Sequence, residues 1–110
     1  MKVVIARVGQ EPKAIEIENT LEAMQALVGG YIEVVPWTIP EPFVIICNEE
    51  GALTGLPEGW LGLRGDIFVT RRDFRHSGEF ATLTDVEAAA IIKCLGLEQA
   101  AQARRKEEER

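Results

Sequence analysis

The chain has 110 residues, a hydrophobic fraction of 46% and a formal net charge of −6. This length and apolar content predict one globular domain and exclude a disordered chain. The negative charge argues against binding to nucleic acid or to an acidic membrane surface, because both attract positively charged proteins. No apolar run approaches the roughly 20 residues of a membrane span, and the first residues lack the apolar length of a secretory signal. We therefore expect a cytoplasmic protein.

The first third of the chain predicts a β-hairpin followed by a helix. Val3–Val8 is an apolar run, and Ala14–Glu18 alternates between apolar and charged residues, as in a half-exposed strand. Either Asn19 or Thr20 is suited to be the N-cap of the helix. The helix should stop at the two glycines that begin at Gly29.

The middle third predicts two further strands. Tyr31–Val35 is the first of them. Phe43–Cys47 is apolar throughout, which is typical of a central strand that is covered on both faces. The polar stretch Asn48–Gly51 then predicts a turn, and Ala52–Leu56 a short return strand. The glycine-rich stretch up to Arg64 is expected to be a loop with one helical turn around Trp60.

The last third predicts strand, loop, short strand and helix. Asp66–Arg71 and Phe80–Leu83 have strand patterns. The tetrapeptide Thr84–Glu87 is a capping box and begins an apolar helical segment. Gly96 either ends this helix or weakens it. The final seven residues are all charged, so we expect a solvated or frayed helical tail.

Together these elements predict an α+β fold. A mixed or antiparallel sheet of about five strands should pack against two helices, near residues 20–28 and 84–95. Residues 1–97 would form the single domain and residues 98–110 the charged tail. A small fold with exposed sheet edges also favours a homo-oligomer.

A basic cluster in this acidic chain is the leading candidate for a ligand site. The segment 64–76 carries four arginines against two aspartates. Arginine matches the geometry of phosphate and carboxylate, so the segment predicts binding of a small anionic ligand. The alternative is a solvated loop paired with neighbouring glutamates. The candidate ligand-binding residues are Arg64, Arg71, Arg72, Arg75 and His76.

Other residues carry weaker hypotheses. Trp37 and Trp60 are candidates for partner binding, with core packing as the alternative. Glu33, Glu49 and Glu50 would serve a small hydrolase, although solvent-exposed positions explain them as well.

Cysteine, metal and cofactor chemistry have little support in the sequence. His76 as a base for a thiol at Cys47 or Cys94 is a weak hypothesis, because Cys47 is predicted to be buried. No spacing of residues matches a metal site, a phosphate-binding glycine loop or a cofactor motif.

Two segments resemble a known family. Val28–Val35, with the sequence VGGYIEVV, and Ile46–Gly51, with ICNEEG, resemble a bacterial and phage domain of unknown function, catalogue number 3846. Gly55–Pro57 and Gly78–Asp85 resemble its later parts. This family would have an Asn-Arg pair after Leu-Pro, whereas Glu58 begins a different sequence here. The resemblance implies a small cytoplasmic α+β domain of phages, plasmids and their hosts, without an established activity.

The sequence is compatible with three functions. The first is a non-enzymatic accessory protein that binds a small anion such as a nucleotide. The second is a module that binds, and thereby inhibits or adapts, a host protein. The third is a small hydrolase. The sequence lacks a catalytic constellation, which favours the non-enzymatic functions.

Overall fold

The computed structural model describes residues 1–35, 41–73 and 79–108. These residues form six strands, two α-helices and one short 3-10 turn in an α+β arrangement. The elements in chain order are β1 (Lys2–Ala6), β2 (Lys13–Glu16), α1 (Leu21–Val28), β3 (Ile32–Val35), β4 (Phe43–Asn48), η1 (Trp60–Gly62), β5 (Ile67–Asp73), β6 (Glu79–Ala81) and α2 (Asp85–Glu108).

All strand pairs in the sheet are antiparallel, and β5 is its middle strand. The order is β2-β1-β5-β4-β3, and β6 pairs with the last part of β5 on the same edge as β1. The strand β4 was predicted to be central; it lies inside the sheet between β3 and β5, one place from the middle. The predicted hairpin of β1 and β2 is confirmed, with Val3 opposite Ile15.

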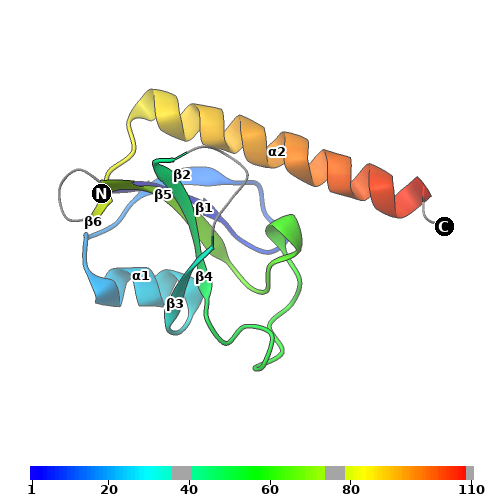
Figure 1. Cartoon of the computed structure of the whole chain (residues 1–110), viewed down its shortest axis with the longest axis horizontal. Helices are drawn as coiled ribbons and strands as arrows, with labels where there is room; N and C mark the ends of the chain where they lie inside the picture. Colours follow the sequence, from blue (N-terminus) through cyan, green and yellow to red (C-terminus); the bar gives the residue numbers. More distant parts are fainter. Residues whose placement is uncertain (36–40, 74–78, 109–110) are drawn as a thin grey trace.

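The two helices cover opposite faces of the sheet, so the domain has three layers (Figure 1). Alternate residues of β5 serve the two cores: Ile67 and Val69 pack toward α2, whereas Phe68 packs toward α1. All three are fully buried. This double burial explains why the sequences of β4 and β5 are apolar at successive positions rather than at alternate ones.

Local hydrogen bonds define the helix ends. The side chain of Thr20 accepts a hydrogen bond from the amide of Ala23, so Thr20 is the N-cap of α1. Gly29 ends α1 in the left-handed conformation, with φ of 76°. The capping box before α2 is also formed: Glu87 N–H donates to Thr84 Oγ1 at 3.1 Å, and Thr84 N–H donates to Glu87 Oε1 at 2.9 Å.

The predicted return strand over Ala52–Leu56 is wrong, and the segment is a series of turns. The amide of Thr54 donates to the carbonyl of Glu50 at 2.9 Å, and the amide of Leu56 donates to the carbonyl of Gly51 at 2.9 Å. These local bonds satisfy the backbone groups that a strand would offer to a neighbour.

The helix α2 continues through Gly96 and is 24 residues long, or roughly 36 Å. Its last turns extend past the sheet (Figure 1). Its inward stripe is apolar at Ala88, Ile91 and Leu95, and continues at the same spacing with Gln99. Neither helix of the described chain is apolar over a length that would cross a membrane.

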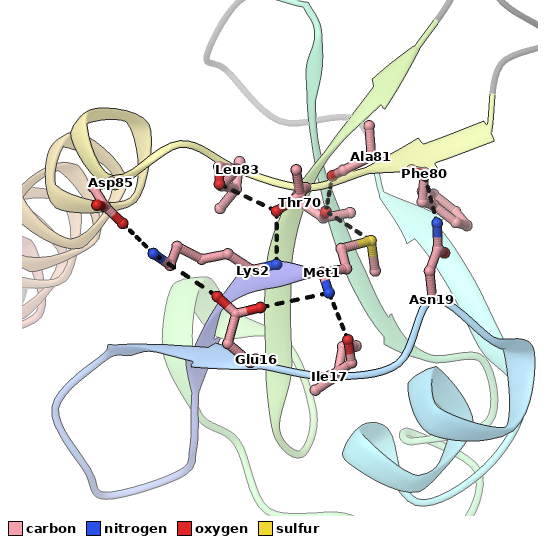
Figure 2. A network of polar contacts seen from close by, with 11 residues as sticks. Met1, Lys2, Glu16, Ile17, Asn19, Thr70, Phe80, Ala81, Leu83 and Asp85 are labelled. Atoms are coloured by element: carbon pink, nitrogen blue, oxygen red, sulfur yellow. Dashed lines mark hydrogen bonds and ion pairs between the residues drawn. The ribbon is translucent and has the colours of Figure 1, made fainter.

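A polar network joins the start of β1 to the start of α2. Figure 2 shows the side chain of Lys2 between the carboxylates of Asp85 in α2 and Glu16 in β2. The hydrogen bond to Asp85 raises the pKa of Lys2, and Lys2 lowers the pKa of Asp85. The pair therefore stabilises the fold between about pH 4 and pH 10, and this contribution is lost outside that range.

Two leucines of α2 provide a test of the three-layer packing. Leu95 is fully buried, whereas Leu97, two residues later, is 64% exposed. We expect Leu95→Ala to lower the free energy of unfolding by about 2–5 kcal/mol, because it leaves a cavity under α2. Leu97→Ala should change it by less than about 0.5 kcal/mol. Urea denaturation followed by circular dichroism measures both values, and equal effects would contradict the assigned face of α2.

Candidate ligand-binding site

The predicted arginine cluster does not come together as one site. Arg64 lies before β5 and forms an isolated β-bridge with Glu58, whereas Arg71 lies near the end of β5. The strand from Ile67 to Arg71 alone spans about 13 Å. Arg64 and Arg71 are therefore separated along the chain by most of β5.

Arg71 and Arg72 point to opposite faces of the sheet, as neighbours in a strand must. Arg71 faces α2, where its Nη1 lies 3.7 Å from Oε1 of Glu87, and its side chain is 38% exposed. The Arg72 guanidinium lies 5.2 Å from the centre of the Phe80 ring, its partner in the register of β5 and β6. The two guanidinium groups therefore have separate surroundings.

The tryptophan hypothesis is corrected for Trp60. Its ring is 8% exposed and packs in the core beneath α2. Its Nε1–H lies 3.1 Å from the carbonyl oxygens of both Arg7 and Gln10. Trp60 thus connects the loop after β1 to the core by hydrogen bonds. Because the side chain is buried, little of its surface is available to a partner. Trp37, Arg75 and His76 lie outside the described residues.

The glutamates considered for hydrolysis lie in β3 and in the turn after β4. Glu33 is in β3, directly opposite Cys47 of β4, with 4.0 Å between Oε2 and Sγ. Burial raises the pKa of the Cys47 thiol, and the charge of Glu33 raises it further. Both effects oppose formation of a thiolate nucleophile. Glu49 and Glu50 are exposed in the turn after β4. The described residues contain no group of three or more His, Cys, Asp or Glu that could hold a metal ion.

A hollow of about 440 Å³ opens at the C-terminal end of α1. Three segments meet there: the last turns of α1, the start of β3, and the turns that follow β4. We call it the α1 hollow. Its lining residues are Gln25, Gly29, Gly30, Tyr31, Asn48, Glu50, Thr54 and Leu56.

The side chain of Asn48 holds these segments together. Its Nδ2 donates to the carbonyl of Val28 at 3.1 Å, which satisfies a backbone acceptor in the last turn of α1. Its Oδ1 accepts from the amide of Glu50 at 2.8 Å, which shapes the turn after β4. The amide of Glu49 donates to the carbonyl of Tyr31 at 2.8 Å and extends the pairing of β3 with β4. The rim of the α1 hollow is therefore held by hydrogen bonds of the Asn48 side chain and by one backbone hydrogen bond.

The α1 hollow offers an exposed ring and several acceptors. Tyr31 is 65% exposed, so its ring is open to a ligand. Leu56 adds apolar surface, and the exposed carboxylate of Glu50 adds negative charge. The hydroxyl of Thr54 donates its proton to the carbonyl of Glu50 at 3.0 Å. The lone pairs of the hydroxyl oxygen can therefore accept a hydrogen bond from a ligand.

Two smaller and more polar hollows lie where the inner side of α2 meets the loops, with volumes of about 260 and 280 Å³. Both are lined by Glu58, Gly59 and Gln99. Gln99 is already engaged there, because its Oε1 accepts from the amide of Leu61 at 3.4 Å. Both hollows lack an exposed ring comparable to Tyr31 among their lining residues.

The fold and this site define a small α+β domain with a ring-bearing hollow beside its first helix. The chain belongs to a family described as a domain of unknown function, DUF3846, whose model matches residues 1–96. No match was found among curated proteins or among solved structures.

Two sequence segments pointed to the α1 hollow, although the residues predicted to bind a ligand were the arginines and His76. The segments VGGYIEVV and ICNEEG, which carried the resemblance to the family, are the two that meet at the hollow. In chain order Tyr31 and Asn48 are far apart, and it is the pairing of β3 with β4 that brings them together. Neither Tyr31 nor Asn48 was among the predicted site residues.

Gly30 tests how strongly Asn48 braces the rim. A β-carbon at position 30 would lie 2.9 Å from Asn48 Nδ2, which is too close unless the amide moves away from Val28. We expect Gly30→Ala to cost about 1 kcal/mol of unfolding free energy. The cost should largely disappear in an Asn48→Ala background, where the amide is absent. A double-mutant cycle in urea measures this coupling, and strictly additive effects would contradict it.

Proposed function

We propose that this protein is a non-enzymatic binding module that holds a small ring-bearing molecule in the α1 hollow. The observation that supports this proposal is the exposed Tyr31 ring beside a hollow of about 440 Å³. This volume falls in the usual range for small-molecule sites. Stacking on an aromatic face gives affinity for a planar ligand without chemistry.

The rim is suited to binding because ordered backbone supports it. Tyr31 directly precedes β3, and Asn48 is the last residue of β4. Residues next to paired strands lose little conformational entropy when a ligand arrives. A preformed rim of this kind favours a ligand that fits without rearrangement of the domain.

Tyr31→Ala is the direct test. Loss of the stacking surface should weaken binding by about 1–3 kcal/mol, or roughly 5- to 150-fold. The measurement is a titration of isotope-labelled protein with a set of ring-bearing fragments, read from the backbone amide signals of Gln25, Gly30 and Thr54. Fragments that bind in the α1 hollow should shift these signals in the unmodified protein. Because Tyr31 is largely exposed, the variant should keep its fold.

Leu53→Ala is the matched control. Leu53 is 89% exposed and belongs to the same series of turns, but it does not line the α1 hollow. It should leave fragment binding unchanged. If no fragment shifts the lining amides, or if Leu53→Ala weakens binding as much as Tyr31→Ala does, the proposal is wrong.

A second candidate function is binding of an anion at Arg71. The Arg71–Glu87 separation of 3.7 Å is longer than a direct hydrogen bond, so guanidinium donors remain for an incoming phosphate or carboxylate. The partial exposure of Arg71 allows access. This proposal keeps the small anionic ligand that the arginine-rich segment suggests, and it places that ligand on the α2 side of the sheet, where the end of β5 faces α2.

Pyrophosphate is a suitable probe for the second candidate. If Arg71 binds anions, titration with pyrophosphate should shift the amide signals of Arg71 and Glu87. Arg71→Ala should weaken the response about tenfold, the effect of a charge-assisted hydrogen bond. Arg64→Ala removes an equal charge beyond the other end of β5 and should leave the response intact. Equal losses in the two variants would indicate general charge attraction instead of a site.

A further inference from the structure

We propose that the ligand of the α1 hollow is a planar nitrogen heterocycle that carries an amino group, which donates hydrogen bonds to the acceptors of the rim. This inference rests on the proposed function and adds the chemical class of the ligand. It differs from the anionic ligand suggested by the arginine-rich segment, because the described residues that line the α1 hollow include a carboxylate, Glu50, and no lysine or arginine.

The described residues that line the α1 hollow include no lysine or arginine. They do include Glu50, whose carboxylate is exposed and forms no ion pair with another described residue. Glu49 is next to it and adds a second negative charge in the same turn. A phosphate group at this position would be repelled and would find no cationic partner.

The end of α1 adds to the acceptor character. The last turn of a helix carries partial negative charge because its carbonyl groups point outward. The carbonyl of Gln25 accepts from the amides of Gly29 and Gly30, at 2.8 and 3.1 Å, and the carbonyl of Val28 accepts from Asn48. The neighbouring lining residues therefore face the negative end of the helix dipole.

Two donors of the rim are occupied within the protein. The side-chain amide of Asn48 donates to the carbonyl of Val28 and accepts from the backbone amide of Glu50. The hydroxyl of Thr54 donates its proton to the carbonyl of Glu50. The carboxylate of Glu50 and the remaining lone pair of Thr54 are acceptors. A ligand gains most here if it supplies the donors itself, and an amino group on a ring does so.

The Tyr31 ring selects the planar part of the ligand. An aromatic face attracts another ring by stacking and attracts positive charge through its quadrupole. An amino-substituted heterocycle satisfies both preferences, since its ring is flat and its N–H groups carry partial positive charge. An aliphatic amine would use the carboxylate but would forgo the stacking surface.

Two matched pairs of nucleosides test this ligand class. Adenosine has an amino group beside an accepting ring nitrogen, where inosine has a carbonyl oxygen beside a ring N–H, and cytidine and uridine differ in the same way. We expect adenosine to bind about tenfold more tightly than inosine, and cytidine about tenfold more tightly than uridine, because the amino group donates a charge-assisted hydrogen bond to the carboxylate of Glu50. The amide signals of Gln25, Gly30 and Thr54 report the dissociation constants.

Substitutions of two neighbouring glutamates locate the effect. Glu50→Gln should remove most of the preference for the amino member of each pair, because it removes the negative charge. Glu49→Gln removes an equal charge one residue away from the lining and should preserve the preference. Both side chains are exposed, and the backbone amide of Glu50 keeps its bond to Asn48 in the variant.

The outcomes separate this inference from the proposed function. Equal or tighter binding of inosine and uridine, lost in Tyr31→Ala, would overturn the amino-group inference and leave the binding module in place. A failure of all four nucleosides to shift the lining amides would also overturn the ligand class, while the fragment titration decides the proposed function independently. A preference that survives in Glu50→Gln would show that the acceptor argument is wrong.

Discussion

The strand β5 is the constraint on which the other elements depend. It is hydrogen-bonded to β4 along one edge and to β1 and then β6 along the other. Its successive residues Ile67, Phe68 and Val69 are fully buried, two toward α2 and one toward α1. A strand that is filled on both faces and on both edges has little freedom in register, because a shift by one residue would exchange its two cores. The positions of both helices follow from this strand.

The α1 hollow forms where this tightly specified sheet ends and the connections begin. The pairing of β3 with β4 brings Tyr31 next to the turn after β4, and the amide of Asn48 fastens that turn to α1. The residues that hold the rim in shape, such as Gly30 and Asn48, are distinct from Tyr31 and Glu50, which our proposal assigns to the ligand. Because Tyr31 and Glu50 are exposed, the fold does not depend on them.

Much of the fold was predictable because its signals are local. The alternation of Ile15 and Ile17 with glutamates indicated a half-exposed strand, and the capping box at Thr84 indicated the start of α2. The site was less predictable for a physical reason. Closeness in the chain suggested that Arg64 and Arg71 act together, but an extended strand separates them and places neighbours on opposite faces. The residues of the α1 hollow come from distant segments, and only the strand pairing brings them into one place.

The inward residues of α2 are buried up to Leu95 and less buried after it, so the two parts of this continuous helix differ in local stability. Up to Leu95 its inward residues are buried in the core, so opening that part requires most of the domain to open. From Gln99 onward the residues of α2 that face the loops are Gln99, Gln102 and Ala103, and most others of the described side chains are exposed, so this part is held chiefly by its own backbone hydrogen bonds. The distal turns can therefore unwind and reform while the sheet stays intact, as a unit with its own equilibrium at the end of a rigid domain.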